Sequence, residues 1–472
     1  MDRPDTARWT ALLGALEHGL LERQTAVRAL LLAVLAGEHV LLIGPPGTAK
    51  SELARRLHGA VEAAGYFERL LTRFSTPEEL FGPLSLKALE DDRYERLTAG
   101  FLPTAGVAFL DEVFKANSAI LNALLTLLNE REFDNGSGRQ RTPLLSVVGA
   151  SNEVPADEAL LAFFDRFLLR VPVAPVADAS FAALLTLDKA TSAAGVVPLS
   201  SVERKAVLRA AASVRPGERA LAACASLRAW LAARGQPLSD RRWRQWVGLM
   251  RVAAASEGRD EVDELDLWSA PFVAAAAPQD VPALAQWFAA ELVGAVAHDA
   301  PWLTHAVEAF ERQLQIEQSA TPDDAQGAQA AGKLALARSI GRGDRGGGDP
   351  DAGMPRIVAR PLEEQLRRRY SRVHIDARVA QIDEPIAQVL AQQADLEAQC
   401  ARLAERLAAR VWLPPELAQR LLGAHRATLA MLADRLARLQ SVRRGLGELP
   451  LRPPHHDDVA PPPVSLEPAG AA

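Results

Sequence analysis

Residues 44–51 read Gly44-Pro45-Pro46-Gly47-Thr48-Ala49-Lys50-Ser51, between an apolar run at 40–43 and a helix-like stretch at 52–57. This order of strand, glycine-rich turn and helix is the context of a phosphate-binding P-loop. Backbone N–H groups of such a loop point inward, and the helix N-terminus adds positive potential. We therefore expect all eight residues to hold nucleotide phosphates, with Lys50 on the β- and γ-phosphates and Ser51 on Mg²⁺. Ala49 stands where the usual pattern has glycine, and the alternative is an ordinary Gly/Pro turn before a helix.

The bulk composition narrows the class of protein. A chain of 472 residues with 49% hydrophobic residues can form two to four domains with sizeable cores. Its 53 basic and 59 acidic residues give a net charge of −6, which argues against a bulk nucleic-acid binder but leaves a local basic groove possible. The two cysteines, Cys224 and Cys400, have no ligand-like spacing, so neither a disulfide framework nor a zinc site is expected. The N-terminus lacks a signal-peptide pattern and no run of about 18 apolar residues occurs, which predicts a soluble, cytoplasmic protein without membrane insertion.

The first part of the chain alternates strand-like and helix-like stretches. Apolar runs at residues 40–43, 107–110, 144–150 and 167–171 are typical of strands buried on both faces, and a helical stretch at 118–130 lies between two of them. This alternation predicts an α/β nucleotide-binding domain with a doubly wound parallel sheet over residues 1–173. A connection at 174–198 then leads to residues 199–296, which lack β-branched runs and predict an all-α lid domain.

The remainder is predicted to be helical with flexible parts. We expect a helical segment at 297–320, a flexible Gly-rich linker at 321–360, a C-terminal helical hairpin at 361–449 and a disordered Pro-rich tail at 450–472. Heptad-like leucines in the hairpin favour an internal bundle seam over a free coiled coil, and Leu413-Pro414-Pro415 would form its turn. The tail sequence His455-His456-Asp457-Asp458 is interpreted as solvated chain rather than a metal site.

Candidate chemistry follows the second and third apolar runs. Asp111 and Glu112 end one of them, where Asp111 would hold Mg²⁺ and Glu112 would orient and polarise the attacking water. A loop carboxylate pair is the alternative. Asn152 follows the next run and either positions water or forms an Asx turn. Arg166, between aromatic residues, is either packed and salt-bridged or reaches a neighbouring subunit's phosphate as an arginine finger.

Together these motifs resemble the AAA+ ATPases, most closely the MoxR group and within it the RavA branch. The resemblance covers about residues 10–300 and is carried by strings at 19–23, 44–51, 73–85, 93–103, 109–112, 119–125, 128–131, 150–153 and 165–166. It implies a Mg²⁺-dependent ATP hydrolase that forms a homohexamer and remodels or matures an unknown protein client. It also implies a partner with a von Willebrand factor A (VWA) domain, similar to ViaA, whose own metal site lies outside this chain.

The resemblance assigns roles to single residues. Asn152 would be the sensor-1 residue, Arg166 the arginine finger acting in trans, and Arg241 the sensor-2 residue acting in cis, with Arg242 as the fallback. An insert at 77–103 and a hairpin at 133–139 would face a central pore and contact the client. The β-rich domain that interrupts the RavA helical extension has no evident counterpart, so decarboxylase binding is not expected. A nucleotide-gated scaffold and, less favoured, a nucleic-acid motor are the alternative functions.

Overall fold

The computed structural model describes residues 6–62, 65–136, 138–155, 157–187, 197–292, 300–320, 368–455 and 458–465. The linker predicted at 321–360 lies outside the described residues, as do the start of the predicted hairpin, part of the tail, and His456 and Asp457. The chain divides into two units, Met1–Val296 with Ala404–Leu421, and Ala297–Leu403 with Leu422–Ala472.

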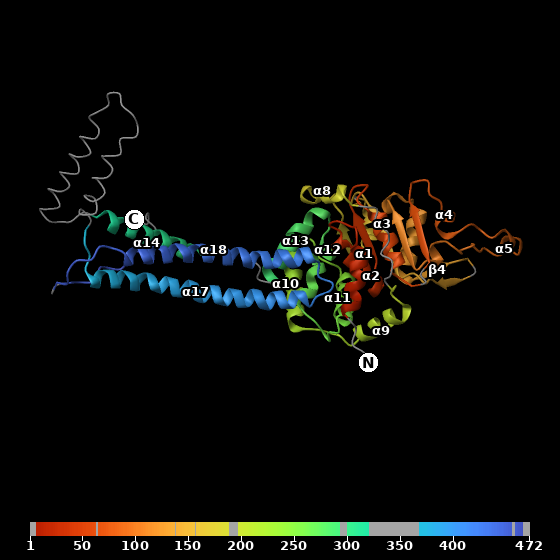
Figure 1. Cartoon of the computed structure of the whole chain (residues 1–472). Helices are drawn as coiled ribbons and strands as arrows, with labels where there is room; N and C mark the ends of the chain where they lie inside the picture. The colour runs from red at the N-terminus through yellow and green to blue at the C-terminus, as the bar shows by residue number, and fades with distance from the viewer. Residues whose placement is uncertain are drawn as a thin grey trace, which may run out of the picture. The chain divides into compact units, whose positions relative to one another are not determined.

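The first unit contains a five-stranded parallel sheet in the order β2-β3-β6-β1-β7 (Figure 1). Its strands are β1 (Val40–Ile43), β2 (Tyr66–Leu70), β3 (Val107–Asp111), β6 (Ser146–Ser151) and β7 (Leu169–Pro172). The registers place Leu41 opposite both Gly149 and Arg170, and Leu110 opposite Gly149. The α/β fold class predicted from the sequence is therefore confirmed. The edge strand β2 was not predicted, because three of its five residues are exposed and it forms no continuous apolar run.

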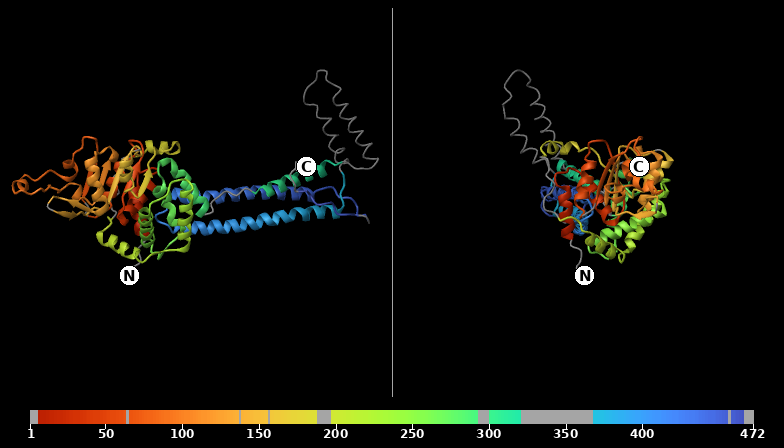
Figure 2. Two further views of the ribbon diagram at one scale, coloured as in Figure 1. Left: turned by 180° about the vertical axis from the view of Figure 1, so that it is seen from behind. Right: turned by 90° about the vertical axis from the view of Figure 1, so that its right-hand side faces the viewer.

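Helices cover both faces of the sheet, as Figure 2 shows from two sides. One layer comprises α1 (Thr6–Glu17), α2 (Gln24–Ala36) and α3 (Lys50–Gly59), which pack on one another and on the strands. On the other face, α6 (Ser118–Glu130) and α7 (Glu158–Phe164) enclose a core that includes Leu41, Leu110 and Val147. Because strand side chains alternate, both faces of the sheet are buried, as a doubly wound fold requires.

Two insertions extend from this sheet and pack against each other. The first holds α4 (Pro77–Phe81), α5 (Leu86–Glu90) and η1 (Leu102–Thr104), and the second is the antiparallel pair β4 (Glu132–Asp134) and β5 (Arg139–Arg141). A short helical turn, η2 (Val113–Lys115), follows β3. Phe81 stacks on Phe133 with ring centroids 5.3 Å apart, and the buried Asn135 accepts a hydrogen bond from the Arg96 amide at 2.7 Å. These contacts give the first insertion a defined position relative to the β4–β5 pair.

The lid region of the first unit is mostly helical, as predicted. After α8 (Asp178–Leu185) it contains α9 (Ser201–Ala211), α10 (Glu218–Ala232), α11 (Asp240–Ser256), η3 (Glu264–Ser269), α12 (Ala270–Ala274), η4 (Pro278–Asp280), α13 (Val281–Trp287) and the π-helical turn η5 (Phe288–Leu292). A two-residue parallel pair, β8 (Arg215–Pro216) and β9 (Glu261–Val262), is the exception to the all-helical expectation. None of the helices in the described ranges is long and apolar enough to cross a membrane.

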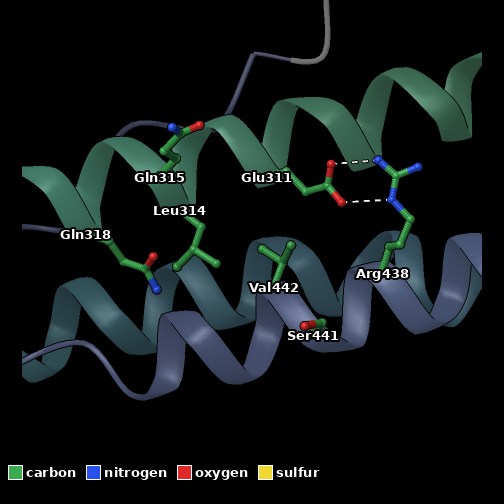
Figure 3. A pocket seen from close by; sticks show the side chains of 7 residues that line it. All are labelled: Glu311, Leu314, Gln315, Gln318, Arg438, Ser441 and Val442. Atoms are coloured by element: carbon green, nitrogen blue, oxygen red, sulfur yellow. Dashed lines mark hydrogen bonds and ion pairs between the residues drawn. The ribbon is translucent and has the colours of Figure 1, made fainter. Parts of the chain in front are cut away.

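The second unit is built from α14 (Pro301–Ser319) and most of α17 (Arg372–Ala408) and α18 (Pro415–Gly447). Val389 and Leu439 are fully buried in its core, so the leucine pattern forms an internal seam, as expected. A shallow groove lies between α14 and α18, where Glu311 accepts two hydrogen bonds from Arg438 at 2.8 and 2.6 Å (Figure 3). The helical segment expected before the linker thus completes a three-helix bundle with the hairpin.

The turn of the hairpin belongs to the first unit. Trp412 is 1% exposed, its ring lies 5.9 Å from that of Trp9, and its indole N–H donates to Ser256 Oγ at 2.7 Å. Arg410 forms ion pairs with Asp263 and with Glu257 of the lid. A buried aromatic contact and charged hydrogen bonds therefore hold this turn on the lid.

Candidate nucleotide site

The loop between β1 and α3 has the backbone that its sequence predicts. A side chain at Gly44 would place its Cβ 2.0 Å from the Val173 carbonyl oxygen, so only glycine fits there. Gly47 has a φ of 80° and Ala49 a φ of 68°, both in the left-handed region. For Ala49 this conformation costs about 1 kcal/mol relative to glycine. The loop therefore keeps the left-handed geometry at the position where alanine replaces the usual glycine.

The loop presents free N–H groups at the start of a helix. Within the described part of the chain, the backbone N–H groups of Gly47 and Ala49 have no hydrogen-bond acceptor, whereas the Thr48 N–H closes the turn at Pro46-Gly47. Arg23, only 6% exposed, donates to the Thr48 carbonyl at 3.2 Å and to the Ala174 carbonyl at 2.7 Å. These contacts fix the loop through its carbonyl groups and leave N–H groups without acceptors. Such N–H groups can bind an anion such as phosphate. In the sequence Arg23 stands out only as the last residue of the string at 19–23, because its contacts with the loop depend on the folded chain.

Lys50 lies where the loop meets the neighbouring strand. Its Nζ donates to the carbonyl oxygens of Gly44 at 2.7 Å and Pro45 at 2.9 Å, and lies 3.5 Å from Asn152 Oδ1. Burial lowers the pKa of Lys50, and the nearby carboxylates of Asp111 and Glu112 partly offset this effect. The ammonium group is thus held at the loop by charge-assisted hydrogen bonds to carbonyl groups, and phosphate oxygens are acceptors that can take their place.

Glu112 and Asn152 are directly paired. Asn152 Nδ2 donates to Glu112 Oε1 at 2.6 Å, and Lys115 Nζ lies 3.3 Å from Glu112 Oε2. The amide of Glu112 donates to Asp111 Oδ1 at 3.0 Å, and Glu112 has a left-handed φ of 52°. A strained non-glycine residue of this kind is often found at a functional site. The structure thus brings four of the predicted residues, Lys50, Asp111, Glu112 and Asn152, to one edge of the sheet.

The two predicted metal ligands have suitable chemistry. Ser51 is the second residue of α3, Asp111 is the last residue of β3, and α3 packs on β3. A hydroxyl and a carboxylate are oxygen donors of the kind that Mg²⁺ prefers. Nowhere in the described ranges do three or more His, Cys, Asp or Glu side chains gather into a metal site. Mg²⁺ at Ser51 and Asp111 would therefore need phosphate oxygens and water to complete its coordination.

The two predicted arginines lie at the opposite edge of the sheet. Arg166 precedes β7, and the repulsive charge of Arg241 is one of the factors that lower its pKa, after burial. Arg241 donates to Asn129 Oδ1 at 2.9 Å. The adjacent Leu128 carbonyl lies 3.2 Å from Nε2 of His39, the residue before β1. Four strand residues, about 13 Å, separate this amino edge from the P-loop edge. Within one chain, the structure does not bring Arg166 or Arg241 to the P-loop.

Arg242 has a different environment from its neighbour. It is 2% exposed, and its guanidinium donates to carbonyl oxygens of Phe167, Leu168 and Val273 at 3.1, 2.8 and 2.7 Å. It also donates to the carbonyl and carboxylate of Asp165, at 3.0 and 3.2 Å. Arg242 therefore fastens α11 to the loop that carries Arg166. Both of its terminal nitrogens donate within the fold, which favours the exposed Arg241 over Arg242 as a phosphate contact.

Two known families of protein domains match the sequence of the first unit. Residues 7–207 match the model described as the MoxR domain in the MoxR-vWA-beta-propeller ternary systems, and residues 221–288 match an AAA lid domain. The first unit thus carries a MoxR-family AAA ATPase domain followed by its AAA lid.

Individual relatives extend the similarity. Two uncharacterized proteins of Methanocaldococcus jannaschii are each 41% identical to this chain over 249 residues, or 52% of its length. The alignments cover 66% and 64% of those proteins, so the chain spans just under two thirds of the curated relatives that it matches. Protein MoxR of Paracoccus denitrificans is 32% identical over 187 residues, which is 38% of this chain and 54% of that protein.

Proposed function

We propose that this chain is a Mg²⁺-dependent ATP hydrolase of the MoxR type that acts as a homohexamer in the cytoplasm, with each nucleotide bound between two copies. The observation that carries the proposal is the connected set Lys50, Asn152 and Glu112 beside open P-loop N–H groups, in a chain whose Arg166 lies at the other edge. Gly44, Pro45, Pro46 and the rest of the loop through Ser51 surround the phosphates.

Each residue of the proposed site has its own role in ATP hydrolysis. Lys50 and the loop N–H groups hold the β- and γ-phosphates, and Ser51 and Asp111 hold Mg²⁺, which neutralises charge on the phosphate oxygens. Glu112 orients and polarises the attacking water, and Asn152 holds the Glu112 carboxylate in place through their 2.6 Å hydrogen bond. Loss of the Glu112 carboxylate stops hydrolysis without removing the phosphate-binding groups.

The proposed role in trans applies both to the half-buried Arg166 and to the exposed Arg241. Arg166 and Arg241 lie near each other at the amino edge. A second copy that brings Arg166 to a γ-phosphate therefore brings Arg241 with it. We thus propose that Arg241 acts in trans, in place of the cis role expected from the resemblance. Two guanidinium groups at the transferred phosphoryl group stabilise its developing charge.

The biological role is proposed from the matched family model. That model describes MoxR domains in ternary systems with vWA and β-propeller components. We place this chain in such a system, where ATP turnover remodels or matures a protein client together with a VWA-domain protein, and not in the RavA branch. A ViaA-like partner is accordingly proposed only in the general sense of a VWA-domain protein.

Mixing inactive variants tests the shared site. Lys50→Ala and Arg166→Ala each abolish turnover, whereas Arg209→Ala, an exposed lid arginine, leaves it unchanged. Equal amounts of Lys50→Ala and Arg166→Ala recover about a quarter of the wild-type rate, because random rings contain that share of intact interfaces. Lys50→Ala mixed with Arg241→Ala recovers activity in the same way if Arg241 acts in trans. No recovery in the first mixture would refute the intersubunit site, and no recovery in the second alone would return Arg241 to a cis role.

A nucleotide-gated scaffold is the second candidate. The observation in its favour is the firm attachment of the hairpin turn to the lid through Trp412 and Arg410, which gives nucleotide-dependent lid movement a route to a docked target. Glu112→Gln binds ATP but does not hydrolyse it. If the ternary complex and its biological output both survive this substitution, the scaffold is the correct function.

A further inference from the structure

Helix α8, labelled in Figure 1, is an apolar helix that the described residues leave exposed. Phe181, Leu184 and Leu185 are spaced by three and four residues and so share one face of the helix. They are 53%, 41% and 71% exposed, and no residue of α8 is buried. Single exposed apolar residues are common on proteins, but a contiguous apolar stripe marks an interaction surface.

The apolar stripe of Phe181, Leu184 and Leu185 lies on a helix that begins beside the nucleotide site. The segment between β7 and α8 is tied to the P-loop, because Arg23 joins the Thr48 carbonyl to the Ala174 carbonyl. The Ala177 amide, at the N-terminus of α8, donates to Glu22 Oε2 at 3.0 Å. The start of α8 therefore lies beside the loop that is proposed to hold the phosphates.

We infer that the stripe formed by Phe181, Leu184 and Leu185 is the docking surface for a second copy of this chain, whose Arg166 edge covers it when ATP is bound between the copies. The inference rests on the proposed function, because the site lacks its arginine until a second copy arrives. It adds the residues that supply the apolar part of the contact.

The charged and apolar residues of the two edges are complementary. The P-loop side presents the exposed acids Glu22 and Asp178 beside the apolar stripe. At the opposite edge Arg241 is exposed, Arg244 is an exposed base of the same helix, and Leu161, whose carbonyl accepts from the Asp165 amide, is 43% exposed. Acidic groups and an apolar stripe thus meet basic groups and an apolar residue. Such pairing orients two copies head to tail and brings Arg166 toward the phosphates.

The test separates docking from chemistry. The variant Phe181→Ser/Leu185→Ser is compared with the wild type and with Leu221→Ser, an exposed leucine of α10 that is 55% exposed. Mass is measured by sedimentation against protein concentration with ATP and Mg²⁺, and ATP binding to the dilute monomer is measured with a fluorescent ATP analogue. We expect the double variant to bind ATP as the wild type does but to need at least about tenfold more protein to assemble and hydrolyse ATP. Leu221→Ser should match the wild type.

Photocrosslinking identifies the occupant of the stripe. A benzophenone amino acid at position 181, with ATP and Mg²⁺, should crosslink one copy to another through a peptide that contains Leu161 or Arg166. A crosslink confined to residues 300–465 of the same chain would overturn the inference, and so would assembly of the double variant at the wild-type concentration. If the wild type itself shows no turnover, or turnover indifferent to Arg166→Ala, the proposed function fails instead.

Discussion

Removal of the buried Arg242 guanidinium tests whether α11 holds the arginine-bearing loop. In Arg242→Ala, the carbonyl oxygens of Phe167, Leu168 and Val273 lose donors that lie within 3.1 Å. Each buried acceptor left unsatisfied costs about 1 kcal/mol, and the loss at Asp165 adds little because this side chain is 34% exposed and keeps its ion pair with Arg170. Part of this cost is offset because the guanidinium no longer has to be buried. We expect the free energy of unfolding of the first unit to fall by about 3 kcal/mol.

The assay follows from the position of the tryptophans. Of eight tryptophans, only Trp302 lies outside the first unit, so tryptophan fluorescence during urea unfolding reports mainly on that unit. Arg241→Ala is the matched control, because this neighbouring side chain is exposed and its loss should cost less than about 0.5 kcal/mol. A loss under about 1 kcal/mol for Arg242→Ala, or equal losses for the two variants, would refute the structural role of Arg242.

Three further substitutions probe other parts of the first unit. Ala49→Gly should raise the free energy of unfolding by about 0.5 kcal/mol because glycine adopts the left-handed conformation without strain. The control Ala54→Gly, inside α3, should lower the free energy of unfolding by about 1 kcal/mol. A lower urea midpoint for Ala49→Gly would show that Ala49 is not strained. Burial raises the pKa of Glu38 to about 7, so the folded state holds this proton more tightly than the unfolded chain. Stability contributed by Glu38 is thus present at low pH and is lost as the pH rises from about 4.5 through 7. Relative to Glu38→Gln, the wild type should lose about 2 kcal/mol across this range in urea titrations, and parallel pH profiles would disprove the shift. Trp412→Ala should cost about 3 kcal/mol and increase amide exchange in the turn at Ala404–Leu421, whereas unchanged exchange would show that this turn does not depend on the Trp9 contact.

The parts of the fold that the sequence predicted are those with strong local signals. Strands β1, β3 and β6 contain apolar runs because both faces of the sheet are covered, and the P-loop pattern follows directly after β1. Edge strand β2, with the sequence Tyr66–Leu70, has no such run, so only its pairing with β3 identifies it. The contribution of α14 to the bundle likewise depends on long-range packing that no local pattern records.

In the candidate site, too, some residues could be placed from the sequence and others could not. Lys50, Asp111, Glu112 and Asn152 follow strands whose carboxyl ends meet at one edge, so their grouping could be expected from topology. The positions of Arg241 and Arg242 could not, because adjacent residues of α11 have opposite environments that depend on how the lid packs against the loop after α7. Local sequence presents both as members of one basic cluster.

The separation of the P-loop and Arg166 on opposite edges of one sheet has a consequence for how many sites can work. In the proposed assembly each copy gives an arginine on one side and receives one on the other. An open row of copies therefore always contains one nucleotide that lacks its arginine and one arginine that has no nucleotide. Only closure into a ring makes the number of complete sites equal to the number of copies. Turnover per chain should then rise with row length and reach its full value when the last contact closes.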